Sequence, residues 1–214
     1  MSEQHCPAPR KLFIQMSGAP GSGKSTTSKL VGKSIDGVVI DHDILKSSLL
    51  EDGILSFDQA AKAAYRIDWA LADTLMEQGR SVVLDCPCNY QTVIDSGTAL
   101  ARKHGFTYWY VECKVNDIDL LNARLQQRVP MRSQRTEVDS LPPDAAAGTQ
   151  DARELFRRWI DSPYSPVDNV IVVDSSGVLS REQCRDAILR HIQFASGQQD
   201  QHTMKTPLRQ LGLE

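Results

Sequence analysis

Residues 18–25 read Gly-Ala-Pro-Gly-Ser-Gly-Lys-Ser, which fits the pattern G-x-x-x-x-G-K-[ST] completely. In such a loop several backbone N–H groups converge on one phosphate chain, and the helix that follows presents its positive end to the same anion. An apolar run at residues 11–17 predicts a buried strand before the loop, and residues 24–33 predict a helix after it. The loop in this context predicts a nucleotide-phosphate site.

The residues of this loop have distinct expected roles. Lys24 is expected to reach the β- and γ-phosphates, and the hydroxyl of Ser25 is expected to bind Mg²⁺. The other residues expected to contact the nucleotide are Gly18, Ala19, Pro20, Gly21, Ser22, Gly23 and Thr26. A glycine-rich turn that fits the pattern by chance is the alternative, which the flanking strand and helix patterns disfavour.

The rest of the chain alternates between short apolar runs and helical patterns, which is typical of a parallel sheet covered by helices on both faces. Further strands are predicted at residues 37–41, 81–85, 106–113 and 170–173. Helices are predicted at residues 43–51, 57–78, 91–104, from a cap at Asn116, and from a capping box of Ser180 and Gln183 to about residue 194. The fold class is therefore α/β, with one domain over residues 1–195.

Two polar segments interrupt this alternation. Residues 129–148 contain three prolines and are predicted to form a small lid, since long irregular segments in compact domains are usually functional or disordered. Residues 196–214 have no periodicity and are predicted to form a mobile C-terminal tail.

Composition argues against several classes of protein. The 214 residues carry a net charge of −3, so no global basic field favours nucleic acid. No apolar run approaches the roughly 20 residues of a membrane span. The five cysteines form neither a C-x-x-C pair nor a metal-binding spacing, and we expect reduced thiols in a cytoplasmic protein. Cys86 and Cys88 are expected to pack rather than to form a disulfide.

Three acids follow predicted strands, where ligands of open α/β sheets bind. Asp85 ends the run Ser-Val-Val-Leu-Asp and could hold Mg²⁺ beside Ser25, directly or through water; the alternative is an acid that caps a loop. Asp41 and Asp43 follow the second strand, and either could accept the proton of a substrate hydroxyl or cap the next helix. We favour Asp43 for catalysis, although its position also suits the N-cap.

Arg124 and Arg128 lie four residues apart on one predicted helix face, directly before the predicted lid. Their guanidinium groups could neutralise a phosphoryl group during transfer, and Arg132 and Arg135 continue this series; the alternative is a solvated basic face. Lys46, one helical turn after Asp43, could face the same cleft, but a position in solvent is favoured.

Four motifs together resemble those of P-loop kinases. They are the loop at residues 18–26, Asp-x-Asp at 41–43, hydrophobic-Asp-Cys-x-x-Asn at 84–89 and Leu-x-x-Arg-x-x-x-Arg at 121–128, in family order. The nearest group is the zeta-toxin-like, AAA_33-type ATP-binding proteins, beside gluconate kinase, chloramphenicol phosphotransferase and the kinase domains of polynucleotide kinases. The resemblance covers about residues 11–195.

This resemblance implies a P-loop NTPase fold, with a five-stranded parallel sheet in adenylate-kinase-like order. It implies that Lys24 and Ser25 bind ATP and Mg²⁺ and that Asp43 activates the acceptor. It also implies that Arg128 acts at the transferred phosphate, with Arg124 one turn earlier. The expected activity is transfer of the γ-phosphate to a hydroxyl of a small molecule. The alternatives are a 5′-hydroxyl polynucleotide kinase, which the acidic net charge disfavours, and a regulatory nucleotide-binding ATPase without an acceptor.

Overall fold

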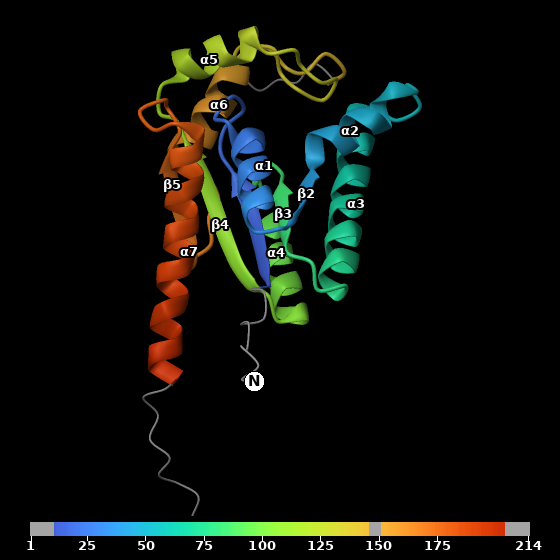
Figure 1. Ribbon diagram of the computed structural model, residues 1–214. Helices are drawn as coiled ribbons and strands as arrows, with labels where there is room; N and C mark the ends of the chain where they lie inside the picture. Colours follow the sequence, from blue (N-terminus) through green and yellow to red (C-terminus); the bar gives the residue numbers. More distant parts are fainter. Residues whose placement is uncertain (1–10, 146–150, 204–214) are drawn as a thin grey trace, which may run out of the picture.

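The computed structural model describes residues 11–145 and 151–203, which form one five-stranded sheet flanked by helices (Figure 1). The strands are β1 (Leu12–Ser17), β2 (Val38–Asp41), β3 (Val82–Asp85), β4 (Thr107–Lys114) and β5 (Val170–Asp174). All neighbouring pairs are parallel, in the order β2-β3-β1-β4-β5. The predicted α/β class and five-stranded parallel sheet are confirmed, and β1 has neighbours on both sides.

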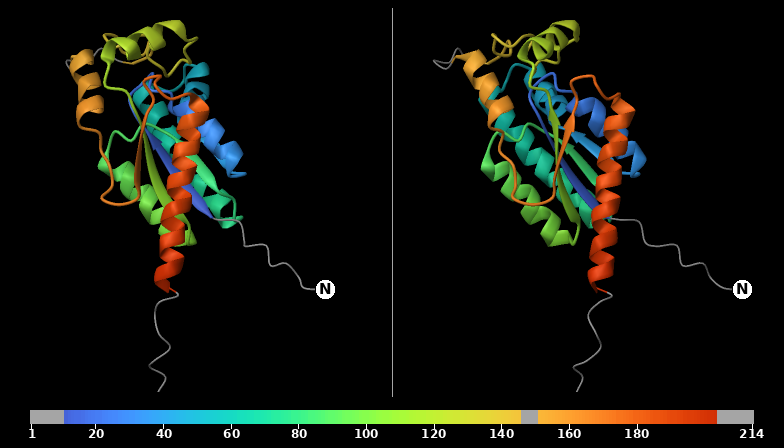
Figure 2. Two further views of the ribbon diagram at one scale, coloured as in Figure 1. Left: turned by 60° about the vertical axis from the view of Figure 1, so that its left-hand side comes forward. Right: turned by 90° about the vertical axis from the view of Figure 1, so that its left-hand side faces the viewer.

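Helices cover both faces of the sheet (Figures 1 and 2). They are α1 (Lys24–Ser34), α2 (His42–Glu51), α3 (Phe57–Glu77), α4 (Gln91–His104), α5 (Ile118–Gln127), α6 (Ala152–Asp161) and α7 (Arg181–Thr203). Helices α1 and α7 pack together on one face, and α3 and α4 pack on the other. No helix of the described residues is both long and apolar enough to cross a membrane.

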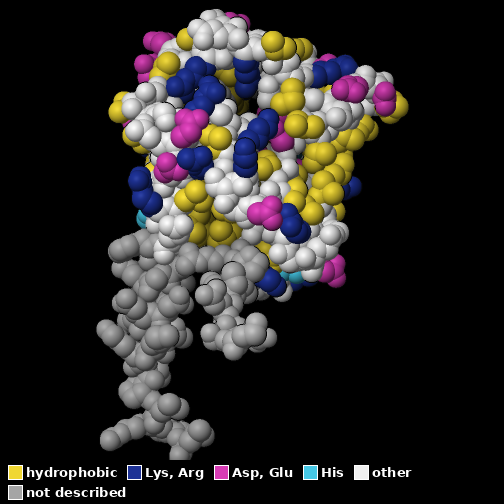
Figure 3. All heavy atoms as spheres, in the orientation of Figure 1, with side chains coloured by type: hydrophobic (Ala, Val, Ile, Leu, Met, Phe, Trp, Pro, Cys, Tyr) yellow, Lys and Arg dark blue, Asp and Glu magenta, His cyan; other side chains and the backbone are white. Residues whose placement is uncertain are grey.

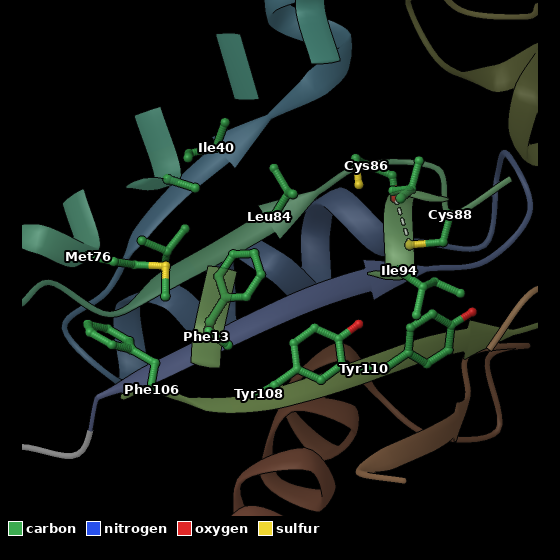
Figure 4. Packing of buried hydrophobic residues seen from close by; sticks show 14 residues of the cluster. Phe13, Ile40, Met76, Leu84, Cys86, Cys88, Ile94, Phe106, Tyr108 and Tyr110 are labelled. Atoms are coloured by element: carbon green, nitrogen blue, oxygen red, sulfur yellow. Dashed lines mark hydrogen bonds between the residues drawn. The ribbon is translucent and has the colours of Figure 1, made fainter. Parts of the chain in front are cut away.

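A hydrophobic core lies on each face of the sheet, and β1 contributes residues to both. Phe13 packs among residues under α3 and α4, whereas Ile14 and Met16 pack under α1 and α7. Figure 4 shows the first of these cores, where the Phe13, Tyr108 and Tyr110 rings lie in a row across β1 and β4. Because both faces of a parallel sheet are buried, its strands appear in the sequence as continuous apolar runs.

Cys86 and Cys88 both lie in this core, and each is a free thiol (Figure 4). The Cys88 thiol donates to the backbone oxygen of Met16 at 3.3 Å. The hydrogen bond with the Cys88 side chain and burial raise the pKa of the Cys86 thiol. The expected packing role is therefore confirmed.

Two helix caps differ from the prediction. Helix α2 begins at His42, and the side chain of Asp41, not of Asp43, caps it by accepting from two backbone N–H groups. Helix α5 is capped by Asp117 rather than Asn116. Both errors are shifts of one or two residues that follow from where the preceding strand ends. The capping box of Ser180 and Gln183 before α7 is confirmed.

Helix α5 and the segment of residues 128–145 lie over the carboxyl edge of the sheet, beside α6 (Figure 2). A third core joins them to the phosphate-loop residue Ala19; its buried members are Ala19, Val115, Leu121, Leu125, Val138, Phe156 and Ile160. Sequence reasoning did not predict α6 as an element. Helix α7 continues to Thr203, further than the predicted end near residue 194. The rest of the expected tail, 204–214, and part of the expected lid, 146–150, lie outside the described residues.

Candidate active site

The loop between β1 and α1 has the backbone of a phosphate cradle. Gly18, Gly21 and Gly23 have φ angles of 130°, 87° and 93°, which side-chain-bearing residues rarely adopt. A Cβ at Gly18 would lie 2.3 Å from the backbone oxygen of Cys113, so close packing also demands glycine there. A Cβ at Gly23 would meet no atom within 4 Å, because this residue borders open space at the N-terminus of α1.

Two polar side chains of this loop have hydrogen-bond donors that are unsatisfied or weakly bonded. The Ser22 hydroxyl is buried and has no hydrogen-bond partner within the described part of the chain. The Lys24 ammonium donates to the backbone oxygen of Ala19 at 3.5 Å, the limit of a hydrogen bond. Unsatisfied donors around open space, at a helix N-terminus, fit a phosphate chain.

Asp85 lies next to this loop because β3 pairs with β1, and Asp85 is opposite Met16 in the register. The hydroxyl of Ser28 donates to its Oδ2 at 3.4 Å. Burial raises the pKa of Asp85 to about 6, although Lys24 and a hydrogen bond from Ser25 oppose the shift. Ser25 and Asp85 thus lie side by side, as a shared cation would require.

The protein groups alone do not form a closed metal site. Among the described residues, no group of three or more His, Cys, Asp or Glu side chains is placed to hold a metal ion. Mg²⁺ typically takes only one or two protein ligands and completes its shell with phosphate oxygens and water. Ser25 and Asp85 fit that kind of site, and their role as Mg²⁺ ligands stays a prediction.

Asp43 points across the cleft to the 128–145 segment. Its Oδ2 accepts from Nε2 of Gln134 at 2.8 Å, and its Oδ1 accepts from the hydroxyl of Ser133 at 3.4 Å. Both partners are neutral. Because the side chain of Asp41 caps α2, the carboxylate of Asp43 does not act as the helix cap.

The two predicted arginines have different environments. Arg124 lies within α5 and donates to the backbone oxygens of Ser175, Ser176 and, at 3.4 Å, Gly21. It therefore joins the phosphate loop to the connection between β5 and α7. Arg128 does not share the helix face as predicted, because α5 ends at Gln127 and the backbone of Arg128 is extended.

This extended backbone places Arg128 in the cleft. Its Nη2 donates to the backbone oxygen of Arg135 at 2.8 Å, and its buried Nε has no partner among the described residues. Burial lowers the pKa of Arg128, and the charge of Asp43 opposes the shift. Arg128 and Asp43 therefore lie close enough to interact electrostatically.

For Lys46, the favoured position in solvent is wrong, and the alternative position in the cleft is confirmed. Lys46 is only 8 % exposed, and its ammonium lies 3.3 Å from the centre of the Phe57 ring. Burial lowers its pKa to about 8, against the opposing charges of Asp43 and Asp58. The apolar start of α3, which folds over α2, accounts for this burial.

A buried His42–Asp68 pair was also missed. Nδ1 of His42 lies 2.6 Å from Oδ2 of Asp68, and the His42 ring lies against that of Tyr65. One signal was present in the sequence, because Asp68 occupies the buried face of α3, in phase with Ala64 and Ala72. The pair ties the first residue of α2 to α3, directly beside Asp43.

The phosphate loop, the two acids Asp43 and Asp85, and the arginines of α5 and its C-terminal end line one cleft of about 1130 Å³ at the carboxyl edge of the sheet. In Figure 3, Lys and Arg side chains in dark blue gather around a hollow beneath α5. The predicted site residues that line the cleft are Gly18, Pro20, Gly21, Ser22, Gly23, Lys24, Ser25, Thr26, Asp43, Asp85, Arg124 and Arg128. Ala19 does not line it and packs in the core under α5.

The phosphate loop lies at the carboxyl edge of a parallel sheet with the strand order β2-β3-β1-β4-β5, and acids and arginines line the cleft around it. This arrangement defines a P-loop nucleotide-binding domain of the kinase type. The chain belongs to the AAA_33 family, described as an AAA domain, whose model matches residues 13–152. The expected P-loop resemblance is thus confirmed. A search of curated proteins found no match.

Solved structures support the same fold. A protein from Chloroflexus aurantiacus j-10-fl, described as a kinase, is 20% identical over 88% of this chain and 99% of its own, with a TM-score of 0.64. The APS kinase CysC of Mycobacterium tuberculosis, in complex with AMPPNP and APS, is 18% identical over 86% and 99%, with a TM-score of 0.57. A gluconokinase from Sinorhizobium meliloti 1021 is 17% identical over 90% and 97%, with a TM-score of 0.54. At these identities the likeness establishes the fold alone.

Proposed function

We propose that this protein is an ATP- and Mg²⁺-dependent phosphotransferase that moves the γ-phosphate to a hydroxyl of a small molecule. One observation carries the proposal. Within the described residues, the carboxylate of Asp43 accepts hydrogen bonds from the neutral side chains of Gln134 and Ser133, and it lines the same cleft as the phosphate loop. A carboxylate in this position can accept the proton of an attacking hydroxyl, which in a kinase belongs to the acceptor and in an ATPase to water.

The nucleotide end of the cleft has a group for each part of the triphosphate. The amides of the loop and Lys24 hold the phosphates, and Ser25 and Asp85 hold the cation that neutralises their charge. Arg124 fixes the loop to the β5–α7 connection, whose residues Gly177 and Leu179 also line the cleft. We place the nucleoside of ATP at this end.

At the acceptor end, Asp43 accepts the proton as the acceptor oxygen attacks the γ-phosphorus. A new P–O bond forms to the acceptor, the bond between the γ-phosphorus and the bridging oxygen breaks, and the electron pair leaves with ADP. Arg128 offers its free Nε to the phosphoryl oxygens during this transfer. Catalysis of this type depends on positioning and charge rather than on covalent chemistry by the protein.

The charges of the cleft distinguish this proposal from a polynucleotide kinase. Asp41, Asp43, Asp58 and Asp85 all line it together with its lysines and arginines. A strand of nucleic acid carries one negative charge per nucleotide and binds to tracks of positive charge. The mixed lining favours a small acceptor.

The deciding experiment is a metabolite-library screen for release of ADP, with mass spectrometry for the gain of one phosphate. We expect at least one hydroxyl compound to gain a phosphate in an ATP- and Mg²⁺-dependent reaction. Hydrolysis of ATP at a rate that no added alcohol changes would support the regulatory ATPase instead.

A further inference from the structure

Arg135 is a buried cation that lines the cleft, and the proposed transfer does not use it. Its side chain is only 6 % exposed. Among the described residues, no carboxylate forms an ion pair with it, and residues 146–150 contain no acid. A buried charge without a counter-charge is costly, so such a group is typically paired when a ligand is bound.

Neutral groups hold the guanidinium of Arg135 in place. Its Nη1 donates to the backbone oxygens of Ser140 at 2.9 Å and Val138 at 3.4 Å, and its Cζ lies 5.1 Å from the centre of the Trp159 ring. These contacts orient the side chain but leave its charge unneutralised. Burial lowers the pKa of Arg135, and no acidic group opposes that shift. The remaining N–H donors form a preorganised fork of the kind that binds carboxylates and phosphates.

Arg132, three residues earlier, shows the contrast within one segment. It is exposed, and its Nε lies 2.6 Å from the carboxylate of Asp144. It does not line the cleft. Within this segment, Asp144 therefore neutralises the exposed Arg132, whereas the buried Arg135 has no ion pair among the described residues.

Arg135 is also tied to the reacting groups. The adjacent residue Gln134 donates to Asp43, and the backbone oxygen of Arg135 accepts from Arg128. Asp43 and Arg135 line the same cleft, so one bound molecule can contact both. The apolar residues Leu141, Pro142, Leu155 and Trp159 line the same cleft, and an apolar lining strengthens charge pairing because it lowers the local dielectric constant.

We propose that Arg135 forms an anion subsite for the acceptor, so that the acceptor carries a carboxylate or a phosphate group in addition to the hydroxyl that reacts. This inference rests on the proposed phosphotransfer, because it assigns the acceptor end of the same cleft. We assign the bound anionic group to the acceptor rather than to ATP. The loop amides, Lys24 and Arg128 already serve the triphosphate.

The test measures binding and does not depend on turnover. The protein is saturated with AMPPNP and Mg²⁺, and its melting temperature is followed with matched pairs of hydroxyl compounds. The pairs are D-gluconate with D-glucitol, D-glycerate with glycerol, and D-glucose 6-phosphate with D-glucose. We expect anionic members to raise the melting temperature and their neutral partners to leave it unchanged. The pairs also separate a carboxylate from a phosphate.

Variants connect that binding to one side chain. Arg135→Gln should weaken anion binding by about 10–100-fold, the range for hydrogen bonds to charged groups, with unchanged affinity for AMPPNP. Arg135→Lys keeps the charge but loses the planar fork, so its loss should be intermediate. Arg132→Gln should bind the anions as the wild type does. If Arg135→Gln fails to fold, the anion affinities of Arg135→Lys and Arg132→Gln are compared instead, and weaker binding by Arg135→Lys alone supports the subsite.

Four results would overturn the subsite: equal binding of neutral and anionic members, no binding by any anion of the panel, unchanged anion binding in Arg135→Gln and Arg135→Lys, or a loss confined to AMPPNP. Failure of the proposed function looks different. Anions would then bind through Arg135, and no compound would gain a phosphate. Phosphorylation of neutral acceptors only would leave the kinase standing and remove the subsite.

Discussion

Oδ1 of Asp41 accepts a hydrogen bond from the backbone N–H of Asp43 at 3.0 Å. Through this bond Asp41 caps α2, and the carboxylate of Asp43 is free to turn toward Gln134 across the cleft. Two acids that look interchangeable in the sequence therefore have separate tasks. Asp41 ends β2 and caps α2, and Asp43 is the proposed general base.

This separation predicts the behaviour of Asp43→Asn. The variant should keep near-normal stability and affinity for AMPPNP, since Asp43 is not the cap. It should lose about 10²–10⁴-fold in phosphotransfer, the usual range for removal of a positioned general base. Melting temperature, nucleotide affinity and kcat for the acceptor found by the screen measure the three quantities.

Asp41 supplies the matched control. Asp41→Asn should retain both the cap and activity, because Asn caps about as well as Asp, whereas Asp41→Ala should lose about 1 kcal/mol of stability. Loss of transfer in Asp41→Asn with normal transfer in Asp43→Asn would move the catalytic role to Asp41. Normal transfer in both would remove the carboxylate mechanism.

Lys24→Ala tests the nucleotide end. The fold should be unaffected, because within the described residues the ammonium of Lys24 makes a single long hydrogen bond, to Ala19. Turnover should fall by roughly 10²-fold or more, the scale for deleting one preorganised electrostatic group. Lys33→Ala, at the exposed end of the same helix, is the control and should turn over ATP normally. Wild-type turnover by folded Lys24→Ala would refute the nucleotide site.

Arg128→Ala tests the transferred phosphate. If the buried Nε of Arg128 acts on the transition state, kcat and kcat/KM should fall together, with little change in nucleotide affinity. Steady-state kinetics and AMPPNP titration separate the two effects. A raised KM with the wild-type kcat would instead assign Arg128 to ground-state binding.

Asp85→Asn should stabilise the protein in the absence of Mg²⁺ and nucleotide. The pKa of Asp85 is raised from 3.8 to about 6, so between these values the folded state binds more protons and stability falls as the pH rises. Above about pH 6 the full cost of the buried carboxylate is present. At pH 7.5 the variant should gain about 1–3 kcal/mol, and the gain should vanish below about pH 4.

Denaturant unfolding of wild type and Asp85→Asn across this pH range measures that difference. The same variant should lose Mg²⁺-dependent phosphotransfer if Asp85 supports the cation. A variant that is destabilised at pH 7.5 would show that the Asp85 carboxylate is a structural partner of Ser28 rather than a costly buried charge.

The sequence by itself determined the layers of this protein and the place of its phosphate loop. Apolar runs and helical periodicity are local signals, and helix α4 begins and ends at the predicted residues, Gln91 and His104. The phosphate loop is likewise local, since its conformation depends on its own glycines and on the strand and helix at its ends.

The tertiary structure alone decided which charges are buried and what they face. Asp43 meets Gln134 across 91 positions of sequence, and Lys46 is covered by Phe57 of the next helix. Arg132 and Arg135 have the same chemistry three residues apart, yet only Arg135 is turned into the cleft. Arg132 and Arg135 lie outside the helices and lack the helical periodicity that marks Asp68 as buried, because burial at such positions is created by distant segments that pack over them.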